Sequence, residues 1–131
     1  MSDKGLFHCT VVTPERAVLD CDAEFVALPA WDGEVGILRH RAPLMVKLGI
    51  GVLRVTTAEA TRKMAIDGGF AEMIDNELTV LTEHAYFAAD LDRQEVEQSL
   101  TEALEMDAPD PGWMTKRQRQ IDRAKAQLKI L

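Results

Sequence analysis

The sequence predicts a mostly β protein with a helical end. We expect an N-terminal antiparallel β-sandwich over residues 1–87 and a C-terminal two-helix hairpin over residues 88–131. Two observations lead to this prediction. Short apolar segments separated by turn residues fill the first part, which is typical of sandwiches and barrels. After Ala88 the apolar residues recur at nearly every fourth position, which is the spacing of a helix.

The strands are predicted from alternating patterns and from short, bounded apolar runs. In the first strand, Phe7, Cys9 and Val11 stand at every second position. Further strands are predicted at 17–19, 24–28, 51–56, 63–67, 70–74 and 78–81. Turns are predicted where Gly, Pro, Asn or Asp favour bends, at 13–15, 31–33, 67–69 and 75–77.

The predicted turn after residue 30 is the most informative local feature. Asp32 and Glu34 flank Gly33, and Gly36 follows closely, so we expect both carboxylates to be carried on a tight turn between two strands. A carboxylate on a stiff turn can serve as a docking point for a partner. The local pattern alone is more typical of an ordinary hairpin whose acidic residues serve solubility.

Two apolar stripes predict the helices. Residues of the first stripe, which should end near Met106, are Val96, Leu100, Ala103 and Leu104. Asp92 and Glu95 resemble a capping box at its start, and Asp110 followed by Pro111 fits the start of the second helix. The second stripe consists of Met114, Ile121, Ala124, Leu128 and Leu131. Neither helix buries its stripe alone, so we expect a hairpin that packs on itself, on the sandwich or on a partner.

The charge distribution bounds the kind of partner. A formal net charge of −7 argues against nucleic acid, because phosphate binding draws on clustered Lys and Arg. The charge is uneven: 90–110 carries eight acids against one arginine, whereas 113–131 carries six Lys and Arg against one acid. Neighbouring segments of opposite charge are expected to pair with each other or with a partner.

Other features exclude further classes of protein. The apolar runs are too short to span a bilayer, and 1–5 lacks the apolar core of a signal peptide, so we expect the chain to stay in the compartment where it is made. Cys9 and Cys21 lack a Cys-x-x-Cys spacing and are predicted to be small interior side chains rather than a disulfide or a metal site.

This order of parts resembles the epsilon subunit of F-type proton-translocating ATP synthases. Seven segments carry the resemblance, in the expected order and at the expected separations, over nearly the whole chain. They are VVTPER (11–16), LPAWDGEVGIL (28–38), APL (42–44), GVLRV (51–55), GGFAE (68–72), LTVL (78–81) and AKAQL (124–128). Each segment alone is a weak signal, but the ordered set is specific.

The resemblance implies a non-catalytic rotor subunit of the central stalk that needs no cofactor. In that family the sandwich lies at the foot of the gamma shaft and touches the polar loops of the c-ring, so that proton-driven rotation reaches the catalytic head. The helical hairpin permits ATP hydrolysis when folded on the sandwich. When extended along gamma, it reaches an acidic segment of the catalytic beta subunit and can block hydrolysis. The expected location is the cytoplasmic face of a bacterial plasma membrane, with membrane association only through the complex.

The resemblance also assigns contact residues. The c-ring-facing loop matches Asp32, Gly33 and Glu34, with Glu34 as the principal contact, and the gamma-facing positions match Arg41 and Val46. A basic face on the last helix suits an acidic partner; its residues are Lys116, Arg119, Arg123 and Lys125. The alternative is that this face is simply solvated or pairs with the acidic first helix, since exposed ion pairs contribute little.

Two departures from the family pattern matter. The family usually has Pro-x-His where this chain has Arg39-His40-Arg41, so the gamma contact at this loop is expected to differ. Members that bind ATP carry Asp-x-x-Arg-Ala at the start of the first helix, where this chain has Asp92 followed three residues later by Glu95. An acid in place of the phosphate-facing arginine repels ATP, so we predict no tight nucleotide binding.

Rival functions rest on weaker patterns. A metalloenzyme needs clustered ligands, but the candidate set of His8, His40, His84 and Glu34 is spread along the chain without metal spacing. Neither cysteine lies in a motif that places a base nearby, so a catalytic cysteine is not expected. The more serious alternative is a generic protein-interaction adaptor with a β-sandwich core.

Overall fold

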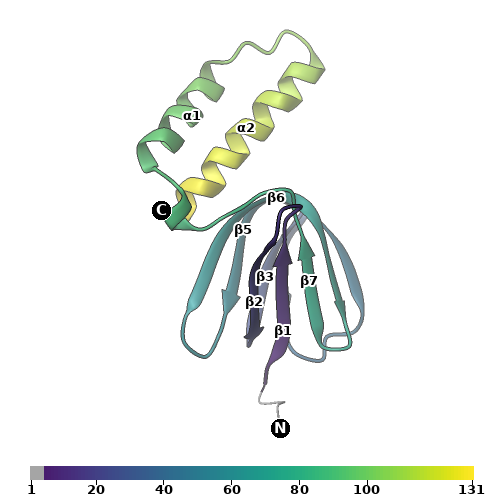
Figure 1. Cartoon of the computed structure of the whole chain (residues 1–131). Helices are drawn as coiled ribbons and strands as arrows, with labels where there is room; N and C mark the ends of the chain where they lie inside the picture. The colour runs from purple at the N-terminus through teal and green to yellow at the C-terminus, as the bar shows by residue number, and fades with distance from the viewer. Residues whose placement is uncertain (1–4) are drawn as a thin grey trace.

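Residues 5–131 of the computed structural model form eight strands and two α-helices (Figure 1). The strands are β1 (Phe7–Val12), β2 (Ala17–Ala23), β3 (Phe25–Ala30), β4 (Gly33–Ile37), β5 (Leu44–Thr56), β6 (Thr61–Ile74), β7 (Glu77–Leu81) and β8 (Ala85–Tyr86). A short 3-10 helix, η1 (Ala88–Asp90), leads to α1 (Arg93–Glu105) and α2 (Pro111–Lys129). The expectation about 1–5 concerns mainly residues 1–4, which lie outside the described range.

The strands form a folded sheet in the order β2-β1-β7-β6-β5-β3-β4, with β8 paired to β6. The predicted fold class, a sandwich followed by two helices, is confirmed. The sheet is mixed rather than wholly antiparallel, because β1 and β7 run in the same direction, with His8 opposite Glu77 and Val12 opposite Leu81. This pairing joins β1 and β7, which are far apart in the sequence, so no local sequence pattern predicts it.

The longest strands, β5 and β6, bend over the end of the sandwich that faces the helices (Figure 1). The predicted turn at 67–69 is wrong: it is a bend inside the continuous strand β6, where Gly68 and Gly69 have φ of 71° and 111°. Glycine is required here because backbone with positive φ disfavours other residues, and a side chain at Gly69 would collide with the carbonyl oxygen of Leu81. Strand β5 also begins earlier than predicted, at Leu44, because it pairs with β6 along both arms of the bend.

Large apolar side chains from both sides of the sandwich fill its core. Phe7, Leu28, Ile37, Leu53 and Met73 are each 2% exposed or less. Burying such a side chain contributes about 1.5–3 kcal/mol relative to leaving it exposed. The alternation of buried and half-buried residues in β1 confirms the pattern predicted for the first strand.

The helices begin and end where the sequence predicts. The Asp92 carboxylate accepts hydrogen bonds from the backbone N–H groups of Gln94 and Glu95, and the Asp110 carboxylate accepts one from that of Trp113 at 2.9 Å. Each carboxylate satisfies backbone donors that have no partner inside the helix. Helix α1 ends at Glu105, next to the predicted end.

The helices pack on each other, and α2 lies across β5 and β6 (Figure 1). Ile121 and Ala124 are buried, as the predicted stripe requires. The outer ends of both stripes are not covered, since Leu104 is 51% and Met114 is 58% exposed. Ala103, next to Leu104, is nevertheless fully buried, and the far end of the hairpin projects beyond the strands (Figure 1).

Candidate interaction sites

The acidic turn is a two-residue hairpin connection. Ala30 of β3 pairs with Gly33 of β4, which leaves Trp31 and Asp32 at the tip. The Trp31 side chain is 69% exposed, and Asp32 is also exposed. Glu34 differs from the prediction, because it lies inside β4 rather than on the turn. The tip thus presents one carboxylate and one large aromatic ring.

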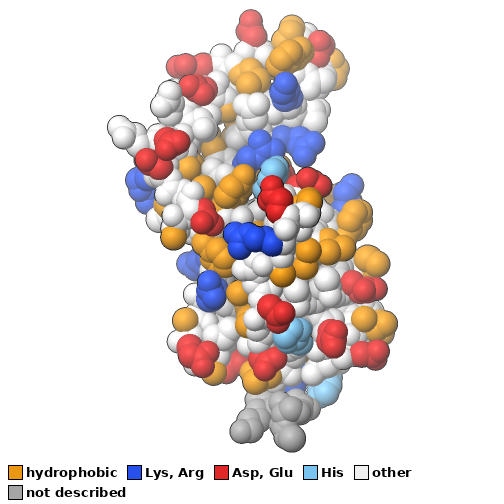
Figure 2. All heavy atoms as spheres, viewed as in Figure 1, with side chains coloured by type: hydrophobic (Ala, Val, Ile, Leu, Met, Phe, Trp, Pro, Cys, Tyr) orange, Lys and Arg blue, Asp and Glu red, His pale blue; other side chains and the backbone are white. Residues whose placement is uncertain are grey.

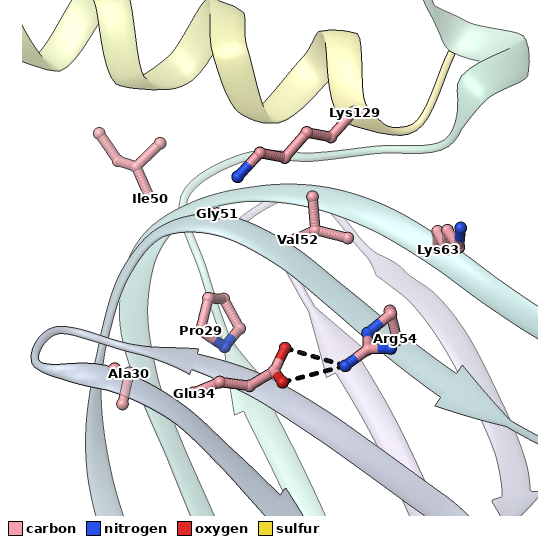
Figure 3. Close-up of a pocket in the computed structure, with 10 residues that line it drawn as sticks. Pro29, Ala30, Glu34, Ile50, Gly51, Val52, Arg54, Lys63 and Lys129 are labelled. Atoms are coloured by element: carbon pink, nitrogen blue, oxygen red, sulfur yellow. Dashed lines mark hydrogen bonds and ion pairs between the residues drawn. The ribbon is translucent and has the colours of Figure 1, made fainter.

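Glu34 is held by an arginine from two strands away. Both of its carboxylate oxygens accept hydrogen bonds from Nη2 of Arg54 at 3.0 Å (Figure 3). Strand β3 lies between β4 and β5, and the compact Pro29, which pairs with Glu34, lets the two long side chains meet across it. This ion pair fixes the orientation of the Glu34 carboxylate.

The same ion pair lines an open groove next to the end of α2. The groove has a volume of about 460 Å³, and Lys63 and Lys129 contribute to its wall. Figure 3 shows the Lys129 side chain reaching from the helix toward the strands, while Ile50 and Val52 point toward the helix. The acidic β3–β4 hairpin and the C-terminal end of α2 are therefore neighbours.

The 39–41 loop leads from β4 to β5. Arg41 is exposed, whereas the backbone N–H of His40, at a φ of 58°, donates to the Asn76 side-chain oxygen at 2.7 Å. Val46 is half-buried and packs against the core of the sandwich. Its neighbour Met45 faces outward instead, because successive residues of a strand point to opposite faces.

An apolar face covers the outside of the first part of β5, the last part of β6 and β7. It consists of Met45, Phe70, Ile74 and Leu81, which are between 45% and 65% exposed. Phe70 lies opposite Leu81 in the β6–β7 pairing, and Glu72, opposite Met45, is the polar residue between Phe70 and Ile74. Exposed apolar side chains gathered on one face indicate a protein-interaction surface.

The basic residues of α2 have different surroundings. Figure 2 shows Lys and Arg side chains gathered where the hairpin meets the sandwich. Arg123 binds the carboxylate of Asp67 in β6, with its Nε 2.9 Å from Oδ2, and Nη2 of Arg119 lies 4.0 Å from Oδ1. Lys116 lies over the Trp113 ring at 4.8 Å, and Lys125 is exposed.

Sequence reasoning missed Asp67. The sequence places Asp67 in the predicted turn at 67–69, but the residue is only 7% exposed. The alternative in which Arg123 pairs with the acidic first helix is wrong, because its partner lies on β6. The local sequence around Asp67 gives no sign of its burial, because the contact depends on how α2 packs on β6.

A second groove lies at the start of α1. This is the segment in which Glu95 stands where ATP-binding members of the family carry an arginine. It has a volume of about 460 Å³ and is lined by Asp90, Asp92 and Glu95 together with Ala89, Leu91, Val96, Ser99 and Gln127. Three carboxylates at one groove give it a negative potential. Such a surface disfavours the phosphates of a nucleotide.

The histidines and cysteines lie in separate places. Within residues 5–131 no group of three or more His, Cys, Asp or Glu side chains is arranged to hold a metal ion. Cys9 and Cys21 are free thiols that lie opposite each other on β1 and β2, and burial raises the pKa of the Cys9 thiol to about 12. A thiol with a raised pKa is a poor nucleophile.

His8 lies on the exposed side of the same pair of strands. Its Nδ1 is 3.3 Å from Asp22, and its Nε2 is 2.6 Å from Asp20. The hydrogen bond to Asp22, together with the charge of Asp20, raises the pKa of the imidazole, although partial burial acts in the opposite direction. Elsewhere, the His84 ring stacks on Tyr86 with 6.2 Å between centroids.

Comparison with known sequences finds one match to the sandwich and others to nearly the whole chain. Residues 6–88 match the family model described as ATP synthase, Delta/Epsilon chain, beta-sandwich domain. The chain is 44% identical to the ATP synthase epsilon chain of Rhodopirellula baltica over 122 residues, which cover 93% of this chain and 95% of the relative. It is 36% identical to the ATP synthase epsilon chain of Symbiobacterium thermophilum over 128 residues, 97% of this chain and 85% of that one.

Comparison with solved structures reproduces the fold. A chain in the cryo-EM structure of the Euglena gracilis mitochondrial ATP synthase aligns with a TM-score of 0.83 at 19% identity, covering 95% of this chain and 80% of its own length. A chain of the Tetrahymena thermophila mitochondrial ATP synthase central stalk and c-ring aligns with a TM-score of 0.68 at 15% identity, covering 93% of both. Among residues 5–131, no helix is both long and apolar enough to cross a membrane. The family match, together with 44% identity over 93% of the chain, shows that the chain belongs to the ATP synthase epsilon chain family.

Proposed function

We propose that this chain is a non-catalytic central-stalk subunit of an F-type ATP synthase. It couples proton-driven rotation of the c-ring to the catalytic head through gamma, and its C-terminal helices regulate ATP hydrolysis. The observation that carries the proposal is the 44% identity to an epsilon chain over 93% of this chain, because it includes the hairpin as well as the sandwich. In this role residues 1–87 dock the rotor, and residues 88–131 are regulatory.

The c-ring contact is proposed at Asp32, Gly33 and Glu34. A two-residue turn with an exposed tip presents its groups at little ordering cost, and both features favour docking against polar loops. Because Arg54 holds the Glu34 carboxylate, Glu34 meets a partner as half of an oriented ion pair. Asp32, at the tip, supplies a carboxylate in the direction of the ring.

The gamma contact is proposed at Arg41 and Val46, extended by the apolar face of Met45, Phe70, Ile74 and Leu81. Arg41 is exposed, and the half-buried Val46 supports the strand from which Met45 projects. An apolar face of this kind loses its contact with water when a long helical partner packs on it. The proposed gamma surface is thus broader than the two positions that the family resemblance assigns.

The catalytic beta subunit is the proposed partner of the basic face in an extended, inhibitory state. Three residues of this face, Lys116, Arg119 and Arg123, line a groove of about 440 Å³ along α2. An acidic segment fits such a groove, and its attraction weakens with salt. In the compact form described above, Arg123 is instead engaged by the sandwich.

No nucleotide, metal, cofactor or nucleic acid is part of this proposal. The acidic groove at the start of α1 supports the expectation of no tight ATP binding. The complex is proposed to lie at a bacterial plasma membrane, with this subunit on the cytoplasmic face and held there only through its partners. Calorimetry of the isolated chain tests the nucleotide part, and micromolar affinity for ATP overturns it.

Removal of residues 88–131 tests the regulatory part of the proposal. ATP hydrolysis by the reconstituted complex is expected to rise, while proton-coupled ATP synthesis persists because the sandwich still joins gamma to the ring. Unchanged hydrolysis contradicts an inhibitory hairpin. A generic adaptor is separated by co-purification with gamma and by adding the intact chain back to a complex that lacks it: an adaptor does not restore ATP-driven proton pumping.

A further inference from the structure

Asp67 is a buried carboxylate placed directly beneath α2. It lies opposite Ile50 in the β5–β6 pairing, and its side chain is 5% exposed. Its backbone N–H donates to the carbonyl oxygen of His84 at 3.2 Å, which fixes the strand at this point. A buried charge is costly unless it is paired, so Asp67 depends on the cations of the helix above it.

One oxygen of this carboxylate is well satisfied and the other is not. Oδ2 accepts from Arg123 through Nε at 2.9 Å and lies 2.8 Å from Nη2. Oδ1 is buried and has no hydrogen bond to any residue that the structure describes, and Nη2 of Arg119 lies 4.0 Å from it. The ion pair is therefore strong at Oδ2 and incomplete at Oδ1. This limits how much it stabilises the docked helix.

The bend of β6 creates this arrangement. The positive φ angles of Gly68 and Gly69 turn the strand immediately after Asp67, so the carboxylate lies at the crest on which α2 rests. On the helix, Arg123 directly precedes the buried Ala124 and follows the buried Ile121 by two positions, so the charged contact lies beside the apolar one. Undocking the helix would separate all of these groups together.

Arg123 also lines the basic groove that the proposed function assigns to an acidic partner. The same guanidinium cannot bind two carboxylates in different places. We infer that Asp67 is an internal competitor for that partner: it latches the hairpin to the sandwich by occupying Arg123, and the hairpin opens when another carboxylate takes the arginine over. The inference rests on the proposed function for the identity of the outer partner, but the latch itself is a property of this chain.

Hydrogen exchange of the full-length chain, read by mass spectrometry, tests the latch. Asp67→Asn and Arg123→Gln are each expected to raise the exchange of α2 amides by about tenfold, because each removes a charge-assisted contact. The double variant is expected to exchange no faster than either single variant, since both changes remove the same interaction. Unchanged exchange in the single variants, or additive effects in the double one, overturns the inference.

Two controls carry the same loss of charge without touching the latch. Glu72→Gln changes an exposed acid of β6, and Lys125→Gln changes an exposed cation of α2, and neither is expected to alter the exchange of α2. If Asp67→Asn also loosens the strands, Arg123→Gln decides, because it leaves every sandwich residue in place. Fast α2 exchange in Arg123→Gln with protected strands supports the latch, and slow exchange overturns it.

ATP hydrolysis by the reconstituted complex then separates the latch from the proposed function. Asp67→Asn frees Arg123 and is expected to lower hydrolysis severalfold, whereas Arg123→Gln opens the hairpin without the arginine and is expected to inhibit less. Equal hydrolysis in both variants, combined with faster α2 exchange, overturns the inhibitory role and leaves the latch intact. Equal hydrolysis with unchanged exchange overturns the latch.

Discussion

The sandwich and the hairpin of this chain are held in place by different kinds of contact. In the sandwich, large side chains such as Phe7, Leu28 and Leu53 are 2% exposed or less, and pairing runs along one continuous sheet. The hairpin buries mostly small or isolated apolar residues and leaves Met114 58% exposed. Its docking also includes the ion pair between Arg123 and Asp67. The smaller apolar contact makes the hairpin the part that separates first when the protein is stressed.

The largest expected effect comes from opening the core of the sandwich. Leu53→Ala removes a fully buried side chain, so the free energy of unfolding is expected to fall by about 2–5 kcal/mol. Urea denaturation followed by circular dichroism measures it. Met45→Ala, on an exposed side chain of the neighbouring arm, is the matched control and is expected to change stability by less than about 0.5 kcal/mol. Similar losses in both variants contradict the assignment of this core.

A core change in the hairpin should act on docking alone. Ile121 is 4% exposed, and Ile121→Ala is expected to favour the undocked hairpin by about 2 kcal/mol while the sandwich keeps its stability. Hydrogen exchange resolves the two regions in one sample. Met114→Ala, at the uncovered end of the same stripe, should leave both unchanged. If the strand amides of Ile121→Ala also exchange faster, the sandwich and the hairpin unfold as one unit. That result contradicts the separate stabilities described above.

A smaller effect is expected from the helix start. Asp110 caps α2 through the N–H of Trp113, so Asp110→Ala should destabilise the hairpin by about 1 kcal/mol. Helix content on heating, followed at 222 nm, measures the loss. Asp107→Ala removes an exposed acid from the same connection and serves as the control. An equal response to both substitutions indicates a general charge effect rather than a cap.

The smallest expected effect is a pH dependence of the sandwich. The hydrogen bond to Asp22 raises the pKa of His8 above 6.5, so its contribution to stability is complete below 6.5 and is lost as the pH rises through the raised value. Unfolding in urea across this range should show a decline of under about 1 kcal/mol, because the side chain is 43% exposed. His8→Gln is expected to abolish the decline, and His84→Gln to retain it. A decline that persists in His8→Gln has another origin.

The sequence predicted the helices better than the strands, for a physical reason. Caps such as Asp92 and Asp110 act within three residues, so local pattern is sufficient to locate them. The continuity of β6 through Gly68 and Gly69 depends instead on pairing with β5 and β7, and glycines in sequence indicate a turn. The parallel pairing of β1 with β7 joins segments about seventy residues apart and leaves no local trace.

The candidate sites divide in the same way. The tip at Asp32 could be predicted because a two-residue turn is a local structure. The position of Glu34 in β4, its partner Arg54 and the buried Asp67 follow from strand register, which the sequence does not report. Sequence reasoning therefore located an exposed residue such as Asp32, and missed the internal contacts that orient Glu34 and occupy Arg123.

The pairing of β1 with β7 has a consequence for biosynthesis. Strand β1 is synthesised before the other strands but lacks one of its two neighbours until Leu81 has been made, so the sheet closes late. Arg123 is synthesised later still. The sheet can therefore be complete before Arg123 is available to pair with Asp67. At that stage the Asp67 carboxylate is exposed at the bend of β6 and can bind another cation.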